Sequence, residues 1–134
     1  MMSFPLKIVT PDGLIYDGEA EQLNVRTIGG DVGILARHMD YVAPLGMGQA
    51  TIITGGIRRT AACIGGMVSV KNGEVTLVPT TFEWADQIDP ERAERSAQRA
   101  QQKLQQADAD AVELKLAEAR LKRALVRKSV HSAR

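Results

Sequence analysis

The distribution of glycine divides the sequence into two parts that cannot share one architecture. All 12 glycines lie at or before Gly73, and all five aromatic residues lie at or before Trp84. After Pro90 the chain contains neither glycine nor proline, and good helix formers dominate. Glycine-rich turns, in contrast, separate short strands. The sequence therefore predicts an α+β protein with a β-sandwich over residues 1–84, a linker over 85–89 and an α-helical hairpin over 90–134.

The first part consists of short strand-forming runs separated by turn signals. The runs QATIIT and IRRTAACI are joined by Gly55-Gly56, and MVSV and EVTLVP flank Lys71-Asn72-Gly73. An Asn-Gly pair between apolar runs is a strong hairpin signal. The glycine-rich stretch 29–34 is interpreted as a β-turn, because no helical pattern follows it. Many short strands with no helix between them predict an all-β sandwich or a flattened barrel.

In the second part, small and apolar residues recur at helical spacing. The two stripes are Ala93, Ala97, Ala100 and Leu104, and Leu114, Ala117, Leu121 and Ala124. Between them lies ADADA (residues 107–111), where Asp108 or Asp110 can cap a helix. We expect two antiparallel helices of about 15–20 residues each. Their alanine seam buries little area, at about 25 cal/mol per Å², so the hairpin should detach or unfold while the sandwich stays intact.

The side chains that catalysis and metal binding require are scarce. Cys63 is the only cysteine, and its small apolar neighbours predict a buried, unreactive thiol. His38 and His131 are the only histidines and lie far apart in the sequence, which gives a zinc site little support. The chain contains no phosphate-binding loop and no nucleophile-elbow motif. We therefore expect a chain that is not an enzyme by itself, with no catalytic residue, no metal site and no required cofactor.

No segment of the sequence approaches the roughly 20 apolar residues that a membrane helix needs. The N-terminal residues contain no long apolar run and no cleavage signal. We therefore expect a soluble, intracellular chain that reaches a membrane only through a partner.

Arginines form two rows in the helical part. The rows are Arg92, Arg95 and Arg99, and Arg120, Arg123 and Arg127, each at spacing i, i+3, i+7. Net charge is −3 through Ile88 and +4 from Asp89 onward. A solvated face, a nucleic-acid-binding surface and a phosphate site all fit such rows. Base stacking is excluded after Trp84 because no aromatic residue follows it, whereas guanidinium groups suit phosphate. Spacing alone favours the solvated face.

Asp89 and Pro90 predict the start of the first helix. The carboxylate can accept hydrogen bonds from the first free amides, and proline suits the first helical position. Because Asp89 occupies the place where an anion would dock, phosphates would lie further along, near Arg99 and the second helix. The Asp89 carboxylate itself would suit an amino group such as that of adenine.

Five segments resemble the epsilon subunit of bacterial F-type ATP synthase, in the same order and over nearly the full length. They are PLKIVTPDGLIYDGEAEQLNV, GGDVGILARHMDYVAPLGMG, IGGMVSVKNGEVTLVP, EWADQIDPERAERSAQRA and LAEARLKRALVRKSV. The second segment is similar to the family's glycine-rich signature, but Ala36 and Arg37 replace the usual Pro-Gly before His38.

The resemblance implies a non-catalytic subunit in the central stalk of the rotor. Its sandwich would contact the gamma subunit and the membrane c-ring, at the cytoplasmic face of the cell membrane. Its hairpin would either lie folded or extend along gamma toward the catalytic alpha and beta subunits, where the extended form blocks ATP hydrolysis. No nucleic acid is expected as a partner of such a subunit. The alternative is a nucleic-acid-binding protein with a basic helical hairpin.

The resemblance also implies ATP as a regulatory ligand, because in some family members ATP binds the folded hairpin. The matching positions are Glu83, Ile88, Asp89, Arg92, Ala93, Arg99, Arg123 and Arg127. Two departures fall near these positions. Phe82 and Trp84 flank Glu83 where smaller or charged residues are common, and Lys122 stands beside Arg123 in the second row.

Overall fold

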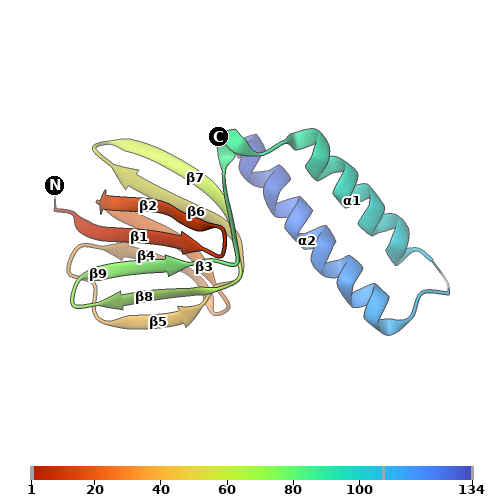
Figure 1. Cartoon of the computed structure of the whole chain (residues 1–134), viewed down its shortest axis with the longest axis horizontal. Helices are drawn as coiled ribbons and strands as arrows, with labels where there is room; N and C mark the ends of the chain where they lie inside the picture. The colour runs from red at the N-terminus through yellow and green to blue at the C-terminus, as the bar shows by residue number, and fades with distance from the viewer. Residues whose placement is uncertain (1, 107, 134) are drawn as a thin grey trace. The chain divides into compact units, whose positions relative to one another are not determined.

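The computed structural model describes residues 2–106 and 108–133 and contains two compact units. The first unit ends at Trp84 and the second begins at Ala85. The first contains ten strands in two five-stranded sheets, and the second contains a short 3-10 helix and two α-helices (Figure 1). This architecture confirms the predicted α+β class, with a sandwich followed by a helical pair. Among the described residues, no helix combines the length and the apolar character needed to cross a membrane.

The strands form two sheets whose order differs from their order in the chain. One sheet has the order β2-β1-β9-β8-β5, and the other has the order β10-β7-β6-β3-β4. All the strand pairs are antiparallel except β1 with β9, which pairs Leu6 with Val75 and Ile8 with Leu77 in parallel. The strands are β1 (Phe4–Thr10), β2 (Gly13–Ala20), β3 (Gln22–Thr27), β4 (Gly30–Leu35), β5 (Tyr41–Pro44), β6 (Met47–Thr54), β7 (Ile57–Ile64), β8 (Met67–Lys71), β9 (Glu74–Val78) and β10 (Thr81–Trp84).

Two hairpins lie where the turn residues predicted them. Strands β6 and β7 are joined by Gly55 and Gly56, which both have positive φ. Strands β8 and β9 are joined by Asn72 and Gly73, with φ of 52° and 80°. Positive φ at both central residues gives the turn the twist that the flanking strands need.

The glycine-rich stretch 29–34 differs from the expected β-turn. Only Ile28 and Gly29 form the turn, and strand β4 begins at Gly30 and pairs with β3 along its whole length. The interpretation as a turn was wrong for most of this stretch. Its Val32 and Ile34 alternate with smaller or polar residues, and Ile34 is fully buried, which is the pattern of a half-buried strand.

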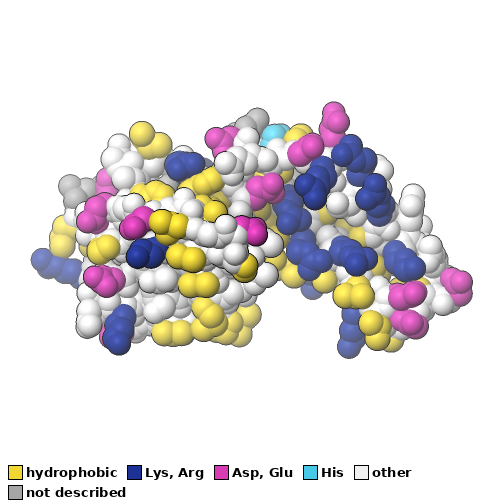
Figure 2. Space-filling view, viewed as in Figure 1, with side chains coloured by type: hydrophobic (Ala, Val, Ile, Leu, Met, Phe, Trp, Pro, Cys, Tyr) yellow, Lys and Arg dark blue, Asp and Glu magenta, His cyan; other side chains and the backbone are white. Residues whose placement is uncertain are grey.

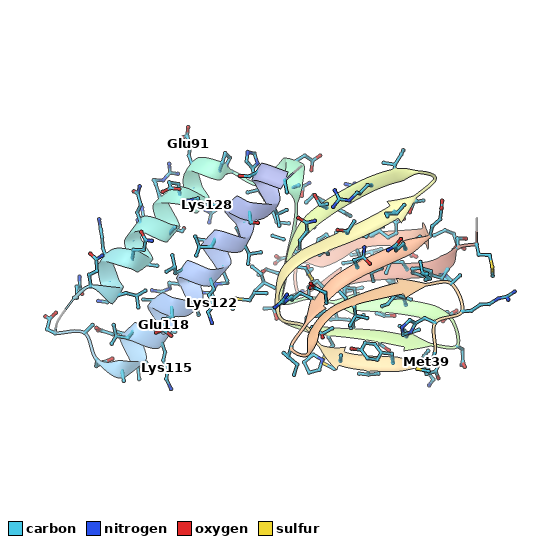
Figure 3. The ribbon with its side chains drawn as sticks, turned by 180° about the vertical axis from the view of Figure 1, so that it is seen from behind. Met39, Glu91, Lys115, Glu118, Lys122 and Lys128 are labelled. Atoms are coloured by element: carbon cyan, nitrogen blue, oxygen red, sulfur yellow. The ribbon has the colours of Figure 1, made fainter. Side chains whose placement is uncertain are left out.

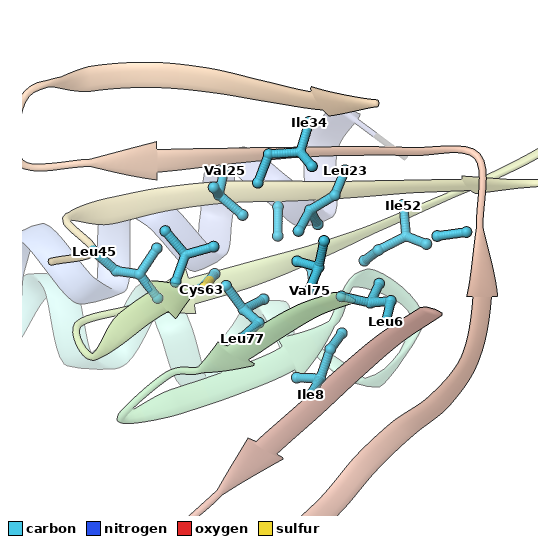
Figure 4. Packing of buried hydrophobic residues seen from close by; sticks show 14 of the residues in the cluster. Leu6, Ile8, Leu23, Val25, Ile34, Leu45, Ile52, Cys63, Val75 and Leu77 are labelled. Carbon is cyan, nitrogen blue, oxygen red and sulfur yellow. The ribbon is translucent and has the colours of Figure 1, made fainter. Parts of the chain in front are cut away.

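The core of the first unit lies between the two sheets and is largely aliphatic (Figure 4). On β1, alternate residues point inward, so Phe4, Leu6 and Ile8 are buried while their neighbours are more exposed. Cys63 lies in the same cluster with 4% of its surface exposed. Burial raises the pKa of the Cys63 thiol to about 12, so the thiol stays uncharged at neutral pH. The predicted buried thiol is confirmed.

Strand β10 ends the first unit with an aromatic pair. Phe82 and Trp84 meet edge to face with ring centroids 4.9 Å apart, and the Arg59 guanidinium lies 3.7 Å from the centre of the Trp84 ring. Because side chains alternate along a strand, Glu83 points to the opposite face of the sheet from Phe82 and Trp84.

Arg37 occupies a backbone position that normally favours glycine. Its φ is 67°, and the His38 amide closes the turn on the Leu35 carbonyl at 3.2 Å. Arg37 therefore supplies a left-handed turn residue between Ala36 and His38. For a residue other than glycine, this left-handed backbone conformation is about 1–2 kcal/mol less favourable than the right-handed one.

Gly66 is the position in the sandwich where a side chain would fit worst. A Cβ atom there would lie 1.9 Å from the Val78 carbonyl oxygen, and the φ of Gly66 is 95°. We expect Gly66→Ala to lower the free energy of unfolding of the sandwich by about 3 kcal/mol. Gly55→Ala is the matched control, because Gly55 also has positive φ but has nothing within 4 Å of the added Cβ. Urea unfolding followed by Trp84 fluorescence measures both. Equal losses would show that backbone conformation alone sets the cost.

The second unit contains η1 (Ala85–Gln87), α1 (Pro90–Leu104) and α2 (Ala111–Ala133). Asp89 caps α1 as predicted, since its Oδ1 accepts hydrogen bonds from the amides of Glu91 at 3.0 Å and Arg92 at 3.2 Å. Asp110 caps α2 by accepting from the Glu113 amide at 2.8 Å. Helix α1 has 15 residues, within the expected length, whereas α2 has 23 and is longer. Residues 111–133 contain no glycine or proline that would interrupt α2. Ala107, within the predicted interruption, lies outside the described residues.

The two helices pair through their alanines. Ala93, Ala97 and Ala100 of α1 and Ala117 and Ala124 of α2 are each 4% exposed or less, as the stripes predicted. The leucines that complete the stripes, Leu104, Leu114 and Leu121, are only half-buried. The seam is therefore made of the smallest apolar side chain, which lets the helices approach closely and removes little apolar area from water.

Candidate anion-binding site

Two ion pairs between α1 and α2 show the register of the two helices. Near the loop, the Lys103 ammonium lies 3.5 Å from a carboxylate oxygen of Glu113. Near the other end, Lys128 donates a hydrogen bond to Glu94. These pairs establish an antiparallel register, and interpolation between them puts Arg99 of α1 opposite Arg120 of α2. Figure 3 labels Lys115 near the start of α2 and Lys128 near its other end.

The ion pair between Glu94 and Lys128 depends on pH. The hydrogen bond from Lys128 and its positive charge lower the pKa of Glu94 below its ordinary value of 4.5. The folded hairpin favours the ionised Glu94 carboxylate. The ion pair therefore stabilises the hairpin above about pH 4.5, and this stabilisation is lost as the pH falls through the lowered pKa. Both side chains are partly exposed, so the contribution is small.

A groove of about 490 Å³ runs between the two helices. Five of its eight lining residues are cationic, and no lining residue is acidic. Figure 2 shows Lys and Arg side chains gathered along this unit. The lining residues are Ser96, Arg99, Ala100 and Lys103 from α1, and Ala117, Arg120, Arg123 and Arg127 from α2. Such a concentration of guanidinium groups suits an anion with several oxygens, because each group can donate two parallel hydrogen bonds.

The groove brings together only some of the residues predicted for a nucleotide site. Arg99, Arg123 and Arg127 line it. Asp89 and Arg92 lie nearer the start of α1 and are exposed. Arg92 is seven residues before Arg99, so both lie on nearly the same helix face about 10.5 Å apart.

The other predicted positions do not line the groove. Ile88 and Ala93 are buried, at 5% and 3% exposure, so they shape the start of the helix and do not present polar groups. Glu83 belongs to strand β10 of the first unit, and the helical pair by itself does not include it. Arg95, which the spacing grouped with Arg92 and Arg99, is exposed and does not line the groove.

Sequence reasoning left Ser96, Lys103 and Arg120 out of the candidate site. Arg120 belongs to the second arginine row, so its spacing already placed it beside Arg123 and Arg127. Lys103 follows Arg99 by four residues, which puts it on the same helix face one turn later. Either spacing could have extended the predicted set.

A second hollow, of about 600 Å³, lies on the sandwich between β3, β4 and β6. Its one basic residue is Arg26, whose guanidinium already pairs with Asp31 at 3.4 Å. The groove between the helices therefore has the greater capacity for an anion. Within the described residues, no cluster of three or more His, Cys, Asp or Glu side chains could hold a metal ion.

Two family models cover almost the entire chain. The ATP synthase delta/epsilon chain β-sandwich domain matches residues 3–85, and the long α-helix domain of the same chain matches residues 86–130. The chain belongs to the ATP synthase delta/epsilon family. Members of this family are non-catalytic subunits, so the predicted family and the prediction that the chain is not itself an enzyme are both confirmed. The alternative of a nucleic-acid-binding protein finds no support.

Relatives in the delta/epsilon family are similar along their full length. The ATP synthase epsilon chain of Halalkalibacterium halodurans is 38% identical over 97% of this chain and 98% of its own length. The ATP synthase epsilon chain of Bacillus cytotoxicus is 41% identical over 97% of each chain. The epsilon chain of Ruminococcus albus is 42% identical over the same shares.

Solved structures share the fold of this delta/epsilon chain. A chain in the cryo-EM structure of Euglena gracilis mitochondrial ATP synthase, OSCP/F1/c-ring, superposes with a TM-score of 0.81 at 23% identity, covering 98% of this chain and 81% of that one. A chain of the Tetrahymena thermophila mitochondrial ATP synthase central stalk/c-ring gives a TM-score of 0.69 at 12% identity and 95% coverage of both. At these identities the likeness establishes the fold.

Proposed function

We propose that this chain is a central-stalk subunit that regulates ATP hydrolysis through its helical pair, with ATP as the regulatory ligand. The groove between α1 and α2 carries the proposal, because five cationic residues line it between two helices joined by small side chains. A weakly packed pair has alternative arrangements of similar free energy. A ligand shifts such a balance by its difference in affinity for the two states.

The sandwich is the part of the chain that we assign to the rotor. The structural neighbours are chains of mitochondrial ATP synthase assemblies, one comprising OSCP, F1 and the c-ring and the other the central stalk and c-ring. We assign gamma and the c-ring as partners of the sandwich, and the alpha and beta subunits as partners of the extended helices. The chain would lie at the cytoplasmic face of the cell membrane and be held there by the complex.

In this proposal ATP lies along the groove with its phosphates toward the arginines. Asp89 uses Oδ1 for both capping hydrogen bonds. Its Oδ2 can accept a hydrogen bond from the adenine amino group. Arg92 lies one helical turn further along α1, and Arg99, Arg123 and Arg127 supply guanidinium groups to the phosphates. ATP would then hold the helices together and oppose their extension toward the catalytic subunits.

The proposal predicts that Asp89→Ser combined with Arg92→Gln weakens ATP binding to the purified chain about 100-fold or more. Two charge-assisted hydrogen bonds to the ligand are lost, each worth about 1.5–3 kcal/mol when formed. Serine keeps the helix cap, so the helix itself should persist. Isothermal titration calorimetry with ATP measures the affinity, and circular dichroism checks the helix content.

Arg95→Gln is the matched control, because Arg95 is an exposed arginine of α1 outside the groove. It should bind ATP as the wild type does. Unchanged affinity in the double variant would remove Asp89 and Arg92 from the site. Absence of heat with the wild type would leave the chain a structural rotor subunit.

A further inference from the structure

We infer that Arg59, Phe82 and Trp84 form an anchor that holds strand β10 in its sheet while the helices move. The joint for that motion then begins at Ala85, the first residue of the second unit. The inference rests on the proposed function for the existence of the motion. It extends that function by naming where the motion stops and by making Arg59 a positioning residue for it. We call the three side chains the β10 anchor.

Strand β10 carries the chain from the sandwich into the helical unit. It has four residues and lies at the edge of its sheet, where it pairs with β7 on one side. The first unit ends at Trp84, and η1, which follows at once, contacts α2 within the second unit. Any displacement of the helices is therefore transmitted first to a short edge strand.

The aromatic side chains of β10 pack into the core of the sandwich. Phe82 and Trp84 lie on one face of the strand, and their partners across the ladder are Cys63 and Ala61, which are buried in the core cluster. Trp84 belongs to the same cluster with 7% of its surface exposed, and Phe82 packs against it. The two rings meet edge to face at 4.9 Å, a geometry that aromatic pairs prefer. Separation of β10 from its sheet would return both rings to water, which is unfavourable.

The Arg59 guanidinium lies over the Trp84 ring. Arg59 precedes Ala61 by two residues on β7, so it is a diagonal neighbour of Trp84 on the same face of the sheet. Its guanidinium carbon lies 3.7 Å from the centre of the ring, within the range of a cation–π contact. Among the described residues, no carboxylate pairs with Arg59. The contact therefore ties β7 to the last residue of β10, directly before the change of unit.

The β10 anchor sets the length of chain that links the two units. If β10 separated from β7, its four residues would join the linker and lengthen it by about 13 Å, at ~3.3 Å per residue. With β10 held in place, a displacement of the helices is taken up by backbone rotation after Trp84. Hinges of this kind consist of a few residues at the end of an element. The anchor thus gives the helical pair a short tether and a defined pivot.

The first test follows hydrogen exchange of the full-length chain by mass spectrometry. Arg59→Gln should raise the exchange rate of the β10 amides about tenfold, as expected for the loss of a cation–π contact, and leave those of β1 and β3 unchanged. Arg58→Gln is the matched control, because Arg58 is also exposed and its side chain points to the opposite face of β7. It should leave β10 exchange at the wild-type rate. No rise in Arg59→Gln, an equal rise in Arg58→Gln, or a rise shared by all strands would overturn the anchor.

A second variant tests whether opening of the helices stops at the β10 anchor. Ala97→Asp places a carboxylate in the buried seam between α1 and α2 and should speed exchange along α1. The β10 amides should keep their wild-type exchange rate in this variant, because the anchor remains intact. Exchange of β10 that rises together with that of α1 would show that the opening passes through Trp84, and it would overturn the inference.

The exchange measurements need neither ATP nor the assembled enzyme, so they separate this inference from the proposed function. A rise in β10 exchange confined to Arg59→Gln, in a chain that gives no heat with ATP, would support the anchor and overturn ATP as the ligand. Binding of ATP by a chain whose β10 exchange is unaffected by Arg59→Gln would leave the proposed function intact and overturn the anchor.

Discussion

Ala97→Asp is expected to separate α1 from α2 while the sandwich remains folded. Ala97 lies in the middle of the seam with 3% of its surface exposed. A carboxylate placed there is buried without a partner, which costs about 4 kcal/mol or more. The alanine seam has little apolar burial with which to offset that cost, and a 15-residue helix such as α1 is marginal in water once unpaired.

Two signals report the two units separately in this variant. Far-UV circular dichroism follows the helices, and Trp84, the only tryptophan, reports on the sandwich by fluorescence. Gln101→Asp is the matched control, because it introduces the same side chain at an exposed position one turn along α1. Helix content that stays at the wild-type level in Ala97→Asp would show that the seam tolerates a charge and is not what holds the helices together.

Truncation after Ile88 is expected to raise ATP hydrolysis by the assembled ATP synthase about fivefold or more. The shortened chain keeps every strand of the sandwich and loses both α-helices. If the extended helices inhibit hydrolysis, their removal abolishes the inhibition. Regulatory coupling free energies of about 1–3 kcal/mol correspond to changes of about 5- to 150-fold.

The comparison requires equal assembly of the two enzymes. Co-purification of the truncated chain with gamma should match that of the full-length chain, because we assign that contact to the sandwich. Added ATP should slow the onset of inhibition in the full-length enzyme and have no such effect after truncation. Equal hydrolysis rates for the two assemblies would count against an inhibitory role for the helices.

Much of the fold could be predicted because its signals are local. Asn72-Gly73 and Gly55-Gly56 predicted two hairpins, and Asp89 with Pro90 predicted the start of α1. Each of these signals depends on backbone preferences within a few residues. The stretch 29–34 was wrongly predicted as a turn because glycine is typical of turns and uncommon in strands. The alternation of Val32 and Ile34 and the hairpin pairing of this stretch with β3 show that it is a strand.

The candidate site was harder to predict, because its lining depends on the register between two helices. Spacing grouped Arg95 with Arg92 and Arg99, yet only Arg99 of these lines the groove. The position of Arg120 opposite Arg99 follows only from the register, which the ion pairs of Lys103 with Glu113 and of Lys128 with Glu94 indicate. The spacing of residues in a sequence predicts which of them share a helix face. It does not predict which part of that face contacts the other helix.

The parallel pairing of β1 with β9 has a consequence for synthesis on the ribosome. Leu6 pairs with Val75, so the first strand has no permanent neighbour on that side until almost the whole sandwich has been translated. Contacts of such long range form slowly, and until they form one edge of β1 is open to other chains. The helices, whose contacts are local, emerge afterwards. A ribosome stalled before Glu74 would therefore carry an unfinished sheet.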